Sequence, residues 1–305
     1  MSEYRWITYE TIDDGEIAII SLNRPKQRNA QHRGLLVELD DAFRAAEEDD
    51  AVRVVILRGN GSAFSSGHDM GSSESLAERG DGEERNPTFD INGGTKDGIE
   101  KMWRQEWHYF FSNTRRWRDL RKITIASVHG QVYAAGLMLM WACDLIVADE
   151  SAQFAEVVGT RLGMCGVEYF AHPWEFGPRR AKELLLTGDT IDASTAYDWG
   201  MVSRVFPVGT LEERTIEFAR RITKVPTAAA LMIKESVNQT VDAQGFYVAL
   251  QSAFSLHELN HAHWAIAQGN ENALVQLPED GVWKASGSLV PRARDVARSP
   301  EPSDD

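Results

Sequence analysis

The sequence predicts an α/β fold, in which buried strands alternate with helices that pack on them. A β-branched run at residues 52–57 is typical of a buried strand. It follows a helical pattern at 32–48, and that pattern follows an apolar strand at 17–22. This order of strand, helix and strand begins a layered α/β domain. Residues 122–144 then combine a β-branched run, a turn and an apolar helical pattern, which is the same arrangement again.

Composition and charge exclude several classes of protein. The chain has 305 residues, a hydrophobic content of 43% and a formal net charge of −14. A general nucleic-acid binder needs a basic surface, so no nucleic-acid partner is expected. Cys143 and Cys165 lie in apolar surroundings without a metal-ligand partner at a recognisable spacing, which predicts buried, reduced thiols and no metal site. No apolar run approaches the roughly 18 residues of a membrane span, so we expect a cytoplasmic protein without membrane contact.

The first elements are a hairpin, a cationic loop and a helix. Residues 7–10 and 17–22 are short apolar or alternating segments, and Asp-Asp-Gly at 13–15 between them is a strong hairpin signal. The loop at 23–30 is polar and carries three cations, so it is either a solvated loop or a ligand-binding one. Apolar residues at three- and four-residue steps over 32–48 predict an amphipathic helix.

The segment after the strand at 52–57 is irregular. Residues 71–98 are rich in Gly, Ser, Asp, Glu and Asn and have little periodicity, which predicts a mobile segment over a site. Aromatic residues between 103 and 117 then mark a helix. Their spacing favours burial against the sheet, with a roof over the site as the alternative.

The remainder of the chain is predicted to become increasingly helical. Strands are expected at 145–148 and 201–205, and helices at 181–186, 193–198, 211–223, 226–241 and 246–267. Residues 168–175 mix aromatic and ionisable side chains in a way that a simple packing helix would not require. The predicted organisation is a core at 1–208, a helical region at 209–275 and a poorly ordered tail at 276–305.

Two glycine-containing turns are the strongest functional signal. The turns at 65–69 and 134–136 each follow a buried strand, so they can lie side by side at one end of the sheet. Two backbone N–H groups that converge on one oxygen form an oxyanion hole. Small residues at 134 and 135 would let a ligand oxygen reach the backbone. The alternative is that these small residues only let a helix pack closely on the sheet.

At these residues the sequence resembles the crotonase family, the enoyl-CoA hydratase/isomerase superfamily, from about residue 7 to residue 268. The resemblance implies a crotonase-like spiral of ββα units with a C-terminal helical trimerisation region, assembled as a homotrimer or a homohexamer. It rests on an ordered set of motifs: Leu22-Asn23-Arg24-Pro25 with Asn29-Ala30, Ala63 to Asp69, Val128-His129-Gly130 to Cys143-Asp144, Ala152-Gln153-Phe154, Arg161-Leu162-Gly163, Leu186-Thr187-Gly188 and Ala196 to Val202.

The resemblance also implies an acyl-CoA substrate, with coenzyme A present as part of the substrate and no permanently bound cofactor. The thioester oxygen would lie between the backbone N–H groups of His68 and Ala135. The loop from Arg24 to Ala30 would hold the nucleotide end of CoA, with Arg24 and Arg28 as candidates for its phosphates.

Two further residues are expected to contact CoA. Ser66 would face the adenine or pantetheine through its backbone. Lys234, on the penultimate helix, would reach a phosphate of the same or a neighbouring subunit.

The sequence departs from the family at the acid/base positions. Family hydratases place two glutamates around the reacting carbons. Here the first position is Met138, and the second is Val158 or Gly159, depending on the motif from which residues are counted. A thioether or an aliphatic group cannot transfer protons, so the two-glutamate mechanism is not expected.

Other ionisable groups lie near these positions in the sequence. Glu156, Glu168 and His172 are the candidate acid/base groups, and the last two would share one face if their segment is helical. The structural alternatives are a surface carboxylate for Glu156, an ion pair or helix cap for Glu168 and a satisfied helix histidine for His172. The His68 side chain is a further candidate, whereas Asp69 is expected to brace its loop.

The sequence therefore predicts an acyl-CoA enzyme that stabilises a thioester enolate, foremost a hydratase-like lyase with non-standard acid/base residues. An isomerase or a decarboxylase of the same fold is the alternative chemistry. A non-catalytic acyl-CoA-binding homologue is the alternative class. A dinucleotide-binding oxidoreductase is set aside because no G-x-G-x-x-G follows a first strand.

Overall fold

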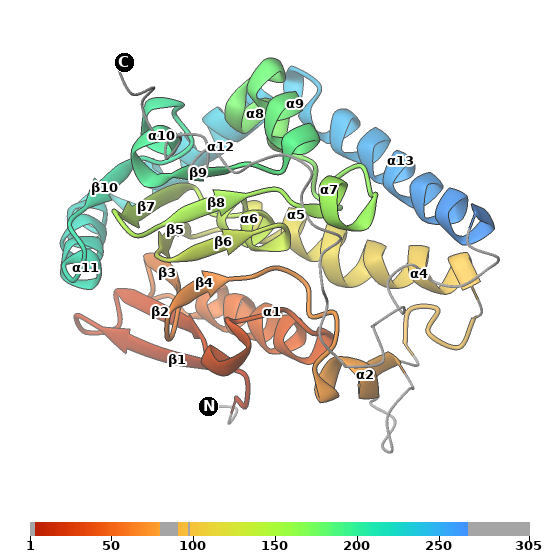
Figure 1. Cartoon of the computed structure of the whole chain (residues 1–305). Coiled ribbons are helices and arrows are strands. Elements are labelled where there is room, and N and C mark those ends of the chain that lie inside the picture. Colours follow the sequence, from red (N-terminus) through yellow and green to blue (C-terminus); the bar gives the residue numbers. More distant parts are fainter. Residues whose placement is uncertain (1–3, 80–90, 97, 268–305) are drawn as a thin grey trace, which may run out of the picture.

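The computed structural model describes residues 4–79, 91–96 and 98–267. Two sheets lie one above the other, with helices around them (Figure 1). The larger sheet has the order β1-β2-β3-β5-β7-β10 and the smaller sheet the order β4-β6-β8-β9. The strands of the larger sheet are β1 (Ile7–Ile12), β2 (Ile17–Leu22), β3 (Val54–Gly59), β5 (Ile123–Val128), β7 (Leu145–Asp149) and β10 (Arg204–Phe206). Those of the smaller sheet are β4 (Ala63–Ser65), β6 (Gln131–Tyr133), β8 (Gln153–Ala155) and β9 (Thr190–Asp192).

Successive strands alternate between the two sheets. From β3 to β8 each strand of the larger sheet is followed along the chain by one of the smaller sheet, and within each sheet these strands are parallel. Helical segments connect one strand pair to the next, so each turn of the spiral is a ββα unit. The predicted α/β class and spiral architecture are therefore confirmed.

The hairpin at the start of the chain follows the predicted turn chemistry. β1 pairs antiparallel with β2, and the Gly15 N–H donates to the Ile12 carbonyl at 3.1 Å. Asp13 and Asp14 both have positive φ, of 54° and 56°. Two positive φ values at the centre of the turn match the right-handed twist of the flanking strands.

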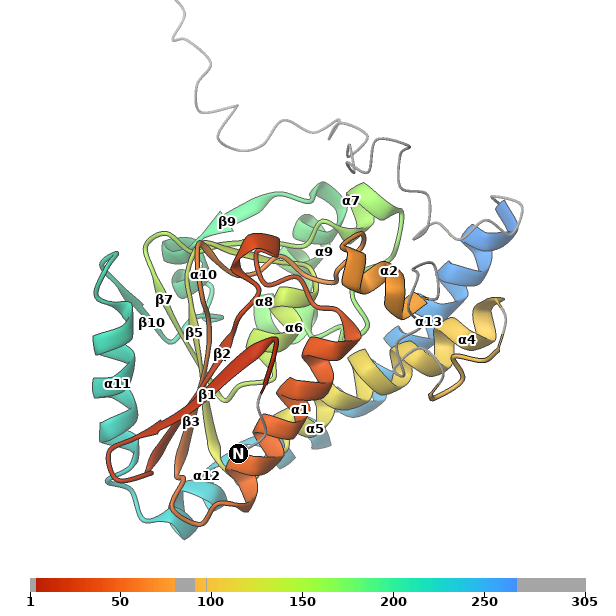
Figure 2. The same cartoon turned by 90° about the horizontal axis from the view of Figure 1, so that it is seen from below.

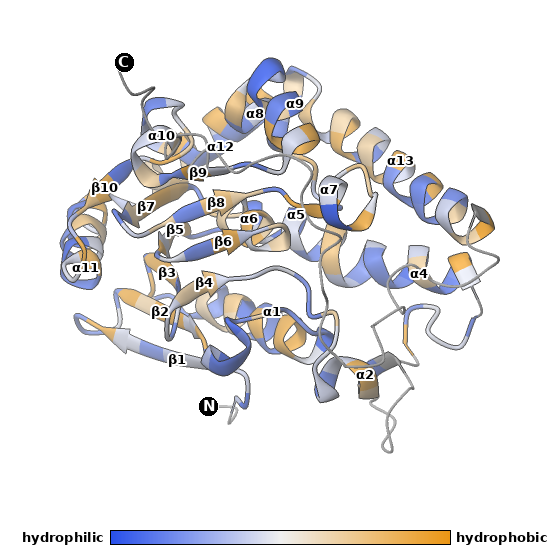
Figure 3. Ribbon diagram, in the orientation of Figure 1, coloured by the Kyte–Doolittle hydropathy of each residue, from blue (hydrophilic) through white to orange (hydrophobic). Residues whose placement is uncertain are grey.

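Helices cover both faces of the larger sheet (Figure 2). Alternate residues of β2 separate the two layers: Ile17 and Ile19 pack toward α11 (Leu211–Ile222), whereas Ala18 and Ile20 belong to the main core. β2 is buried over its whole length, as expected for a strand covered on both faces. In Figure 3 it is largely hydrophobic, whereas β1 at the sheet edge is mixed, in line with its partly exposed pattern.

The main core lies between the sheets and the helices around α6 (Ala135–Trp141), all of whose residues are buried. α1 (Arg33–Glu48) buries the apolar stripe predicted for residues 32–48 against it. The other helices are η1 (Pro25–Gln27), α2 (Ser73–Arg79), α4 (Gly98–Glu106), η2 (Trp107–Ser112), α5 (Asn113–Arg118), α7 (Val158–Leu162), α8 (His172–Phe176), α9 (Pro178–Thr187), α10 (Ala193–Asp198), α12 (Thr227–Ala243) and α13 (Phe246–Ala267).

Two segments differ from the prediction. The irregular stretch 71–98 contains a helix, α2, and its residues 80–90 and 97 lie outside the described part of the chain. The aromatic segment is not one helix, because π-helical η2 separates α4 from α5. Its aromatic side chains also divide: Phe111 and Trp117 are buried, whereas Trp103 and Trp107 are exposed.

The prediction of two buried cysteines is right for Cys143 and wrong for Cys165, which is exposed.

The predicted helical region at 209–275 contains α11, α12 and α13, which ends at Ala267. Residues 268–275 of this region and the tail at 276–305 lie outside the described residues. α13 runs along α4 on one side of the molecule (Figure 1). Within the described residues, no helix combines the length and apolarity needed to cross a membrane.

Candidate functional site

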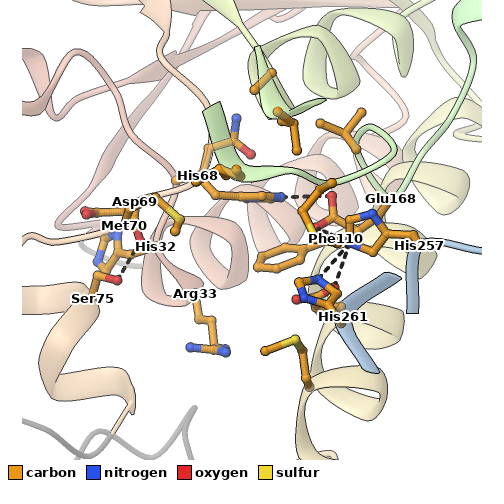
Figure 4. A pocket seen from close by; sticks show the side chains of 18 of the residues that line it. His32, Arg33, His68, Asp69, Met70, Ser75, Phe110, Glu168, His257 and His261 are labelled. Carbon is orange, nitrogen blue, oxygen red and sulfur yellow. Dashed lines mark hydrogen bonds and ion pairs between the residues drawn. The ribbon is translucent and has the colours of Figure 1, made fainter. Parts of the chain in front are cut away.

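A cavity of about 580 Å³ lies beside the two glycine-containing turns and is bounded by α2, η2, α7 and α13 (Figure 4). Ser66, His68 and Ala134 line it on the side of the turns. Phe110 and Glu168 line it next to the His68 side chain. The sites suggested by the turns and by the ionisable segment therefore belong to one cavity.

The two turns are in direct contact. Gly67 has a φ of 98°, and a Cβ atom at this residue would lie 3.0 Å from the Tyr133 carbonyl oxygen and 3.3 Å from the Ala135 nitrogen. A Cβ at Gly136 would lie only 2.5 Å from the Ser65 carbonyl oxygen. Glycine at both positions therefore allows the backbones to approach closely.

The backbone on each side of His68 is fixed. The Gln31 N–H donates to the Gly67 carbonyl at 2.8 Å, and the Asp69 N–H donates to the Gln31 carbonyl at 2.9 Å. Between these bonds, neither the His68 N–H nor the Ala135 N–H donates to a described residue. The two turns thus present two available donors, as the oxyanion-hole prediction requires.

His68 joins the turn to Glu168. Its Nε2 lies 3.0 Å from Glu168 Oε2, and its ring stacks on Phe110 with 3.8 Å between ring centroids (Figure 4). Glu168 is buried, which by itself raises the pKa of its carboxyl, but the adjacent His68 brings that pKa below its usual value. Glu168 is therefore an ionised carboxylate at the cavity wall.

A second group of ionisable residues continues from Glu168. His257 Nε2 lies 3.7 Å from Glu168 Oε1 and 3.2 Å from Glu106 Oε2. His261 Nε2 lies 3.0 Å from His257 Nε2 and 3.4 Å from Glu106 Oε2. All of these side chains are buried and line the cavity.

Opposite charges hold this group together. Burial by itself lowers the pKa of His257, but contacts with Cys165, Glu106 and Glu168 raise it well above its usual value. Burial raises the pKa of Glu106, but His261 and His257 bring it far below the ordinary range. Beside them, burial and the Glu106 carboxylate raise the pKa of Glu258 to about 9.

The predicted helical pairing of Glu168 with His172 is wrong, because α8 begins only at His172 and Glu168 lies in the preceding loop. The two side chains therefore diverge. His172 Nε2 lies 3.0 Å from Glu156 Oε2, and Glu156 Oε1 accepts a hydrogen bond from the Val158 N–H at 3.0 Å. Glu156 and His172 are fully buried and do not line the cavity, so the surface position considered for Glu156 is also wrong.

The two standard glutamate positions carry no ionisable group. Val158 lines the cavity, whereas Met138 is buried in α6. Gly159 packs against the Leu185 carbonyl, where an added Cβ would lie 2.8 Å from its oxygen. The candidate acid/base groups are therefore at other positions.

The residues expected to bind CoA are only partly available. Arg24 Nη1 lies 2.7 Å from Asp69 Oδ2 and also donates to the Ala30 carbonyl, so this guanidinium is used internally. Asp69 thus braces its loop, as predicted. Lys234 donates to Asp144 Oδ2 and to the Lys122 carbonyl, both at 3.0 Å, away from the cavity.

Arg28 and Ser66 have a different environment. The Ser66 N–H donates to the Arg28 carbonyl at 3.0 Å, which joins the cationic loop to the cavity wall. The Arg28 side chain is exposed. These two residues are therefore positioned where a ligand could extend from the cavity to the surface.

Several residues at the cavity were not identified from the sequence. Arg33, Lys96, Lys101 and Arg161 line the cavity as cations. Four carboxylates line it as well: Asp69, Glu78, Glu106 and Glu168. Glu106, His257 and His261 were missed because α4 and α13 are far apart in sequence. One signal was present: residues 257–261 read His-Glu-Leu-Asn-His, an H-E-x-x-H pattern.

Comparison with known proteins places the sequence in a family. The sequence profile of the family described as enoyl-CoA hydratase/isomerase matches residues 13–92 and 89–265. EchA13 of Mycobacterium tuberculosis (strain ATCC 25618 / H37Rv), provisionally named an enoyl-CoA hydratase, is 65% identical over 291 residues, which are 95% of this chain and 91% of that protein. The mitochondrial enoyl-CoA hydratase of Pongo abelii is 33% identical over 225 residues, 73% of this chain and 69% of its own length.

Solved structures give the same result. A crystal structure from Mycobacterium smegmatis, provisionally described as an enoyl-CoA hydratase, superimposes with a TM-score of 0.76 at 40% sequence identity. The match covers 87% of this chain and 98% of the other. The crotonase resemblance inferred from the motifs is thereby confirmed: the chain belongs to the enoyl-CoA hydratase/isomerase family.

Proposed function

We propose that the protein is an acyl-CoA enzyme that hydrates an enoyl-CoA, with Glu168, held by His68, as the acid/base group where the family uses two glutamates. The observation that supports this most strongly is the position of the His68–Glu168 pair. It lies in the same cavity as two contacting turns with available N–H donors. A base and an oxyanion hole at one cavity are the minimum requirement for enolate chemistry.

Each residue would have a distinct role in hydration. The N–H groups of His68 and Ala135 would bind the thioester oxygen and stabilise the negative charge that develops there. Glu168, as a carboxylate, would take a proton from water as its oxygen attacks the β-carbon. The same proton would then return to the α-carbon, so the net reaction adds H and OH across the double bond. His68 would hold the carboxylate by the 3.0 Å contact.

An isomerase is the second candidate, and the lack of the standard glutamate pair favours considering it. Moving a double bond needs one base that removes a proton from one carbon and returns it to another. Met138 and Val158 occupy the positions of the family's two glutamates. Glu168, beside His68, is therefore the candidate for this single base. The same oxyanion hole would serve both reactions.

Family membership supports the proposed substrate and assembly, and cations at and near the cavity support the proposed CoA contacts. Coenzyme A would enter as part of the substrate, with its chain passing Ser66 and its phosphates near Arg28 and Arg161. Arg161 lines the cavity, and its side chain has no partner among the described residues. The C-terminal helices would form the interface of a homotrimer or of a homohexamer.

A spectrophotometric assay distinguishes the two activities. Hydration of a trans-2-enoyl-CoA removes the absorbance of the conjugated thioester, whereas isomerisation of a 3-enoyl-CoA creates it. We expect loss of absorbance with at least one trans-2-enoyl-CoA from a panel of straight, branched and aromatic acyl groups. A gain with 3-enoyl-CoA alone would establish the isomerase instead. Tight CoA-thioester binding without turnover of any of these substrates would leave a non-catalytic acyl-CoA-binding protein.

A further inference from the structure

The cavity wall beyond Glu168 carries a pattern that the proposed hydratase does not use. His257 and His261 are four residues apart on α13, so they occupy one face of the helix. With Glu258 they form His257-Glu258-Leu259-Asn260-His261, and H-E-x-x-H on a helix is a zinc-binding pattern with a physical basis. The pattern alone occurs by chance in many helices, whereas a metal site also requires ligand atoms at coordination distances.

The structure supplies a third ligand from another element. Glu106, at the end of α4 where π-helical η2 begins, directs Oε2 at both histidines. Two histidines of this pattern with a distant glutamate are a known set of catalytic zinc ligands. Within the described residues, this is the group of His, Cys, Asp and Glu side chains whose ligand atoms come close enough to share an ion.

The separations between the ligand atoms match a coordination sphere. The three atoms, His257 Nε2, His261 Nε2 and Glu106 Oε2, are 3.0, 3.2 and 3.4 Å apart. Bonds of about 2.0–2.1 Å at angles between 90° and 110° put neighbouring ligand atoms roughly 2.9–3.4 Å apart. An ion can therefore bind all three atoms with little movement of the side chains.

The surroundings of the ligands also suit a metal. His257 Nδ1 lies 2.8 Å from the Gly166 carbonyl oxygen, and a ring N–H donated to a backbone carbonyl leaves Nε2 as the ligand nitrogen. Glu258 is buried, and neither of its carboxyl oxygens has a hydrogen-bond partner among the described residues. This is the residue that contacts the metal-bound water in the H-E-x-x-H arrangement.

We propose that Glu106, His257 and His261 form a binding site for one divalent transition-metal ion of the zinc class, open on its remaining side toward the acyl-CoA cavity. Two imidazoles select such an ion over Mg²⁺ or Ca²⁺, which prefer oxygen ligands. Three protein ligands leave at least one position for water or a ligand. The competing interpretation is a metal-free cluster, in which protons alone link the same atoms.

Direct metal binding tests the site without reference to turnover. The full chain, with any affinity tag removed, is stripped with a chelator and titrated with Co²⁺, and the visible ligand-field bands are recorded. We expect one Co²⁺ per chain and displacement of the bands by Zn²⁺. Absence of binding to the wild-type chain would overturn the proposal, and it would leave the hydratase proposal untouched.

Single substitutions then locate the ligands. His257→Gln and His261→Gln should each weaken Co²⁺ binding by at least about 100-fold, because loss of even an outer-shell partner costs 10- to 100-fold. His263→Gln is the matched control, since His263 is exposed on the same helix and is not part of the group. Equal binding by all three variants, or loss only in His263→Gln, would place the ion elsewhere and reject the site.

The Zn²⁺-dependent change in Tm is a second test of the ligands, which remains informative if a variant has low stability. Zn²⁺ should raise the Tm of the wild-type chain and of His263→Gln, because a ligand that binds only the folded state stabilises it. It should leave the Tm of Glu106→Gln unchanged, while far-UV circular dichroism confirms that this variant is folded. A full Zn²⁺-dependent rise in folded Glu106→Gln would remove Glu106 from the ligand set.

Discussion

Glu168 and Glu156 are two buried carboxylates that each contact a histidine, yet their positions suggest different roles. Glu168 lines the cavity and contacts His68, whose backbone belongs to the glycine turn. Glu156 contacts His172 beneath the cavity wall and accepts the Val158 N–H. The contrast provides a matched pair of substitutions, one at the proposed base, Glu168, and one at a carboxylate that we expect to support the fold, Glu156.

Glu168→Gln should lower kcat by about 10²–10⁴-fold, because an amide cannot act as a general base. Glu156→Gln should change kcat by less than tenfold. It should instead reduce the free energy of unfolding by about 1–3 kcal/mol, since it alters a buried hydrogen-bonded partner. Steady-state kinetics and urea unfolding of both variants test this. A larger loss of kcat in Glu156→Gln than in Glu168→Gln would reverse the two assignments.

His32 provides a pH-dependent contribution to stability. Burial, with help from the Arg24 guanidinium, lowers the pKa of His32 from 6.5 to about 4. The unfolded chain therefore binds a proton between these values that the folded chain does not. Stability from this residue is complete above pH 6.5 and falls as the pH drops toward 4.

Between pH 7 and pH 5 the His32 contribution should reduce the free energy of unfolding by about 2 kcal/mol. Urea unfolding at both pH values should show this loss in the wild-type chain and a clearly smaller one in His32→Gln. The exposed His263 supplies the control, His263→Gln, which should keep the wild-type difference. An unchanged pH dependence in His32→Gln would rule out His32 as its source.

At the residue scale, functional residues could be predicted from the sequence where a single contiguous motif identifies them. The two glycine turns could be predicted because each is a local pattern that directly follows a buried strand. Their proximity could be predicted because these strands end at the same edge of a sheet. Glu168 could be selected only as one of several ionisable residues. Its separation from His172 depends on where α8 begins, and helix boundaries are the least certain part of a pattern.

The element that carries half of the proposed oxyanion hole is the turn that leads from β6 into α6. Ala134 has a φ of 48° and a ψ of −119°, a conformation that costs a non-glycine residue about 1–3 kcal/mol. Gly136 fits directly against the Ser65 carbonyl of the other turn. The close approach of the two backbones at this point positions the N–H donors.

Gly136→Ala should separate the two turns, because its Cβ would lie 2.5 Å from a backbone oxygen that cannot move independently. We expect a loss of kcat of about 10²–10³-fold, the cost of removing one oxyanion donor. Ala134→Gly is the matched control: it relieves the positive φ, and it should retain activity and be at least as stable as the wild-type chain. Kinetics of both variants test the turn, and full activity in folded Gly136→Ala would exclude this geometry.

At the element scale, periodicity predicted buried strands and amphipathic helices well but not the segments that border the cavity. α2 lies in a polar stretch where no apolar stripe indicates a helix, and η2 departs from the 3.6-residue period that such patterns assume. π-helical turns occur often at functional sites. Here η2 follows Glu106 and carries Phe110, and both line the cavity.

At the scale of the whole molecule, α12 and α13 expose apolar side chains that a monomer would leave in water. Met232, Ile233 and Val237 are all more than half exposed on α12. Val248, Leu256, Leu259 and Ile266 are exposed in the same way on α13. The hydrophobic pattern of α12 and α13 predicted helices, but no pattern within one chain shows which faces a second subunit would cover. An apolar surface on these helices is what the proposed trimer would bury.

Light scattering after gel filtration should give a mass of three or six times the 34.1-kDa chain. Ile233→Lys should shift this mass toward the monomer, because a charge within an apolar interface loses its hydration without gaining a partner. Val208→Lys is the control, since Val208 is equally exposed but precedes the C-terminal helices. If the wild-type chain is a monomer, or if only Val208→Lys disrupts the assembly, α12 is not the interface.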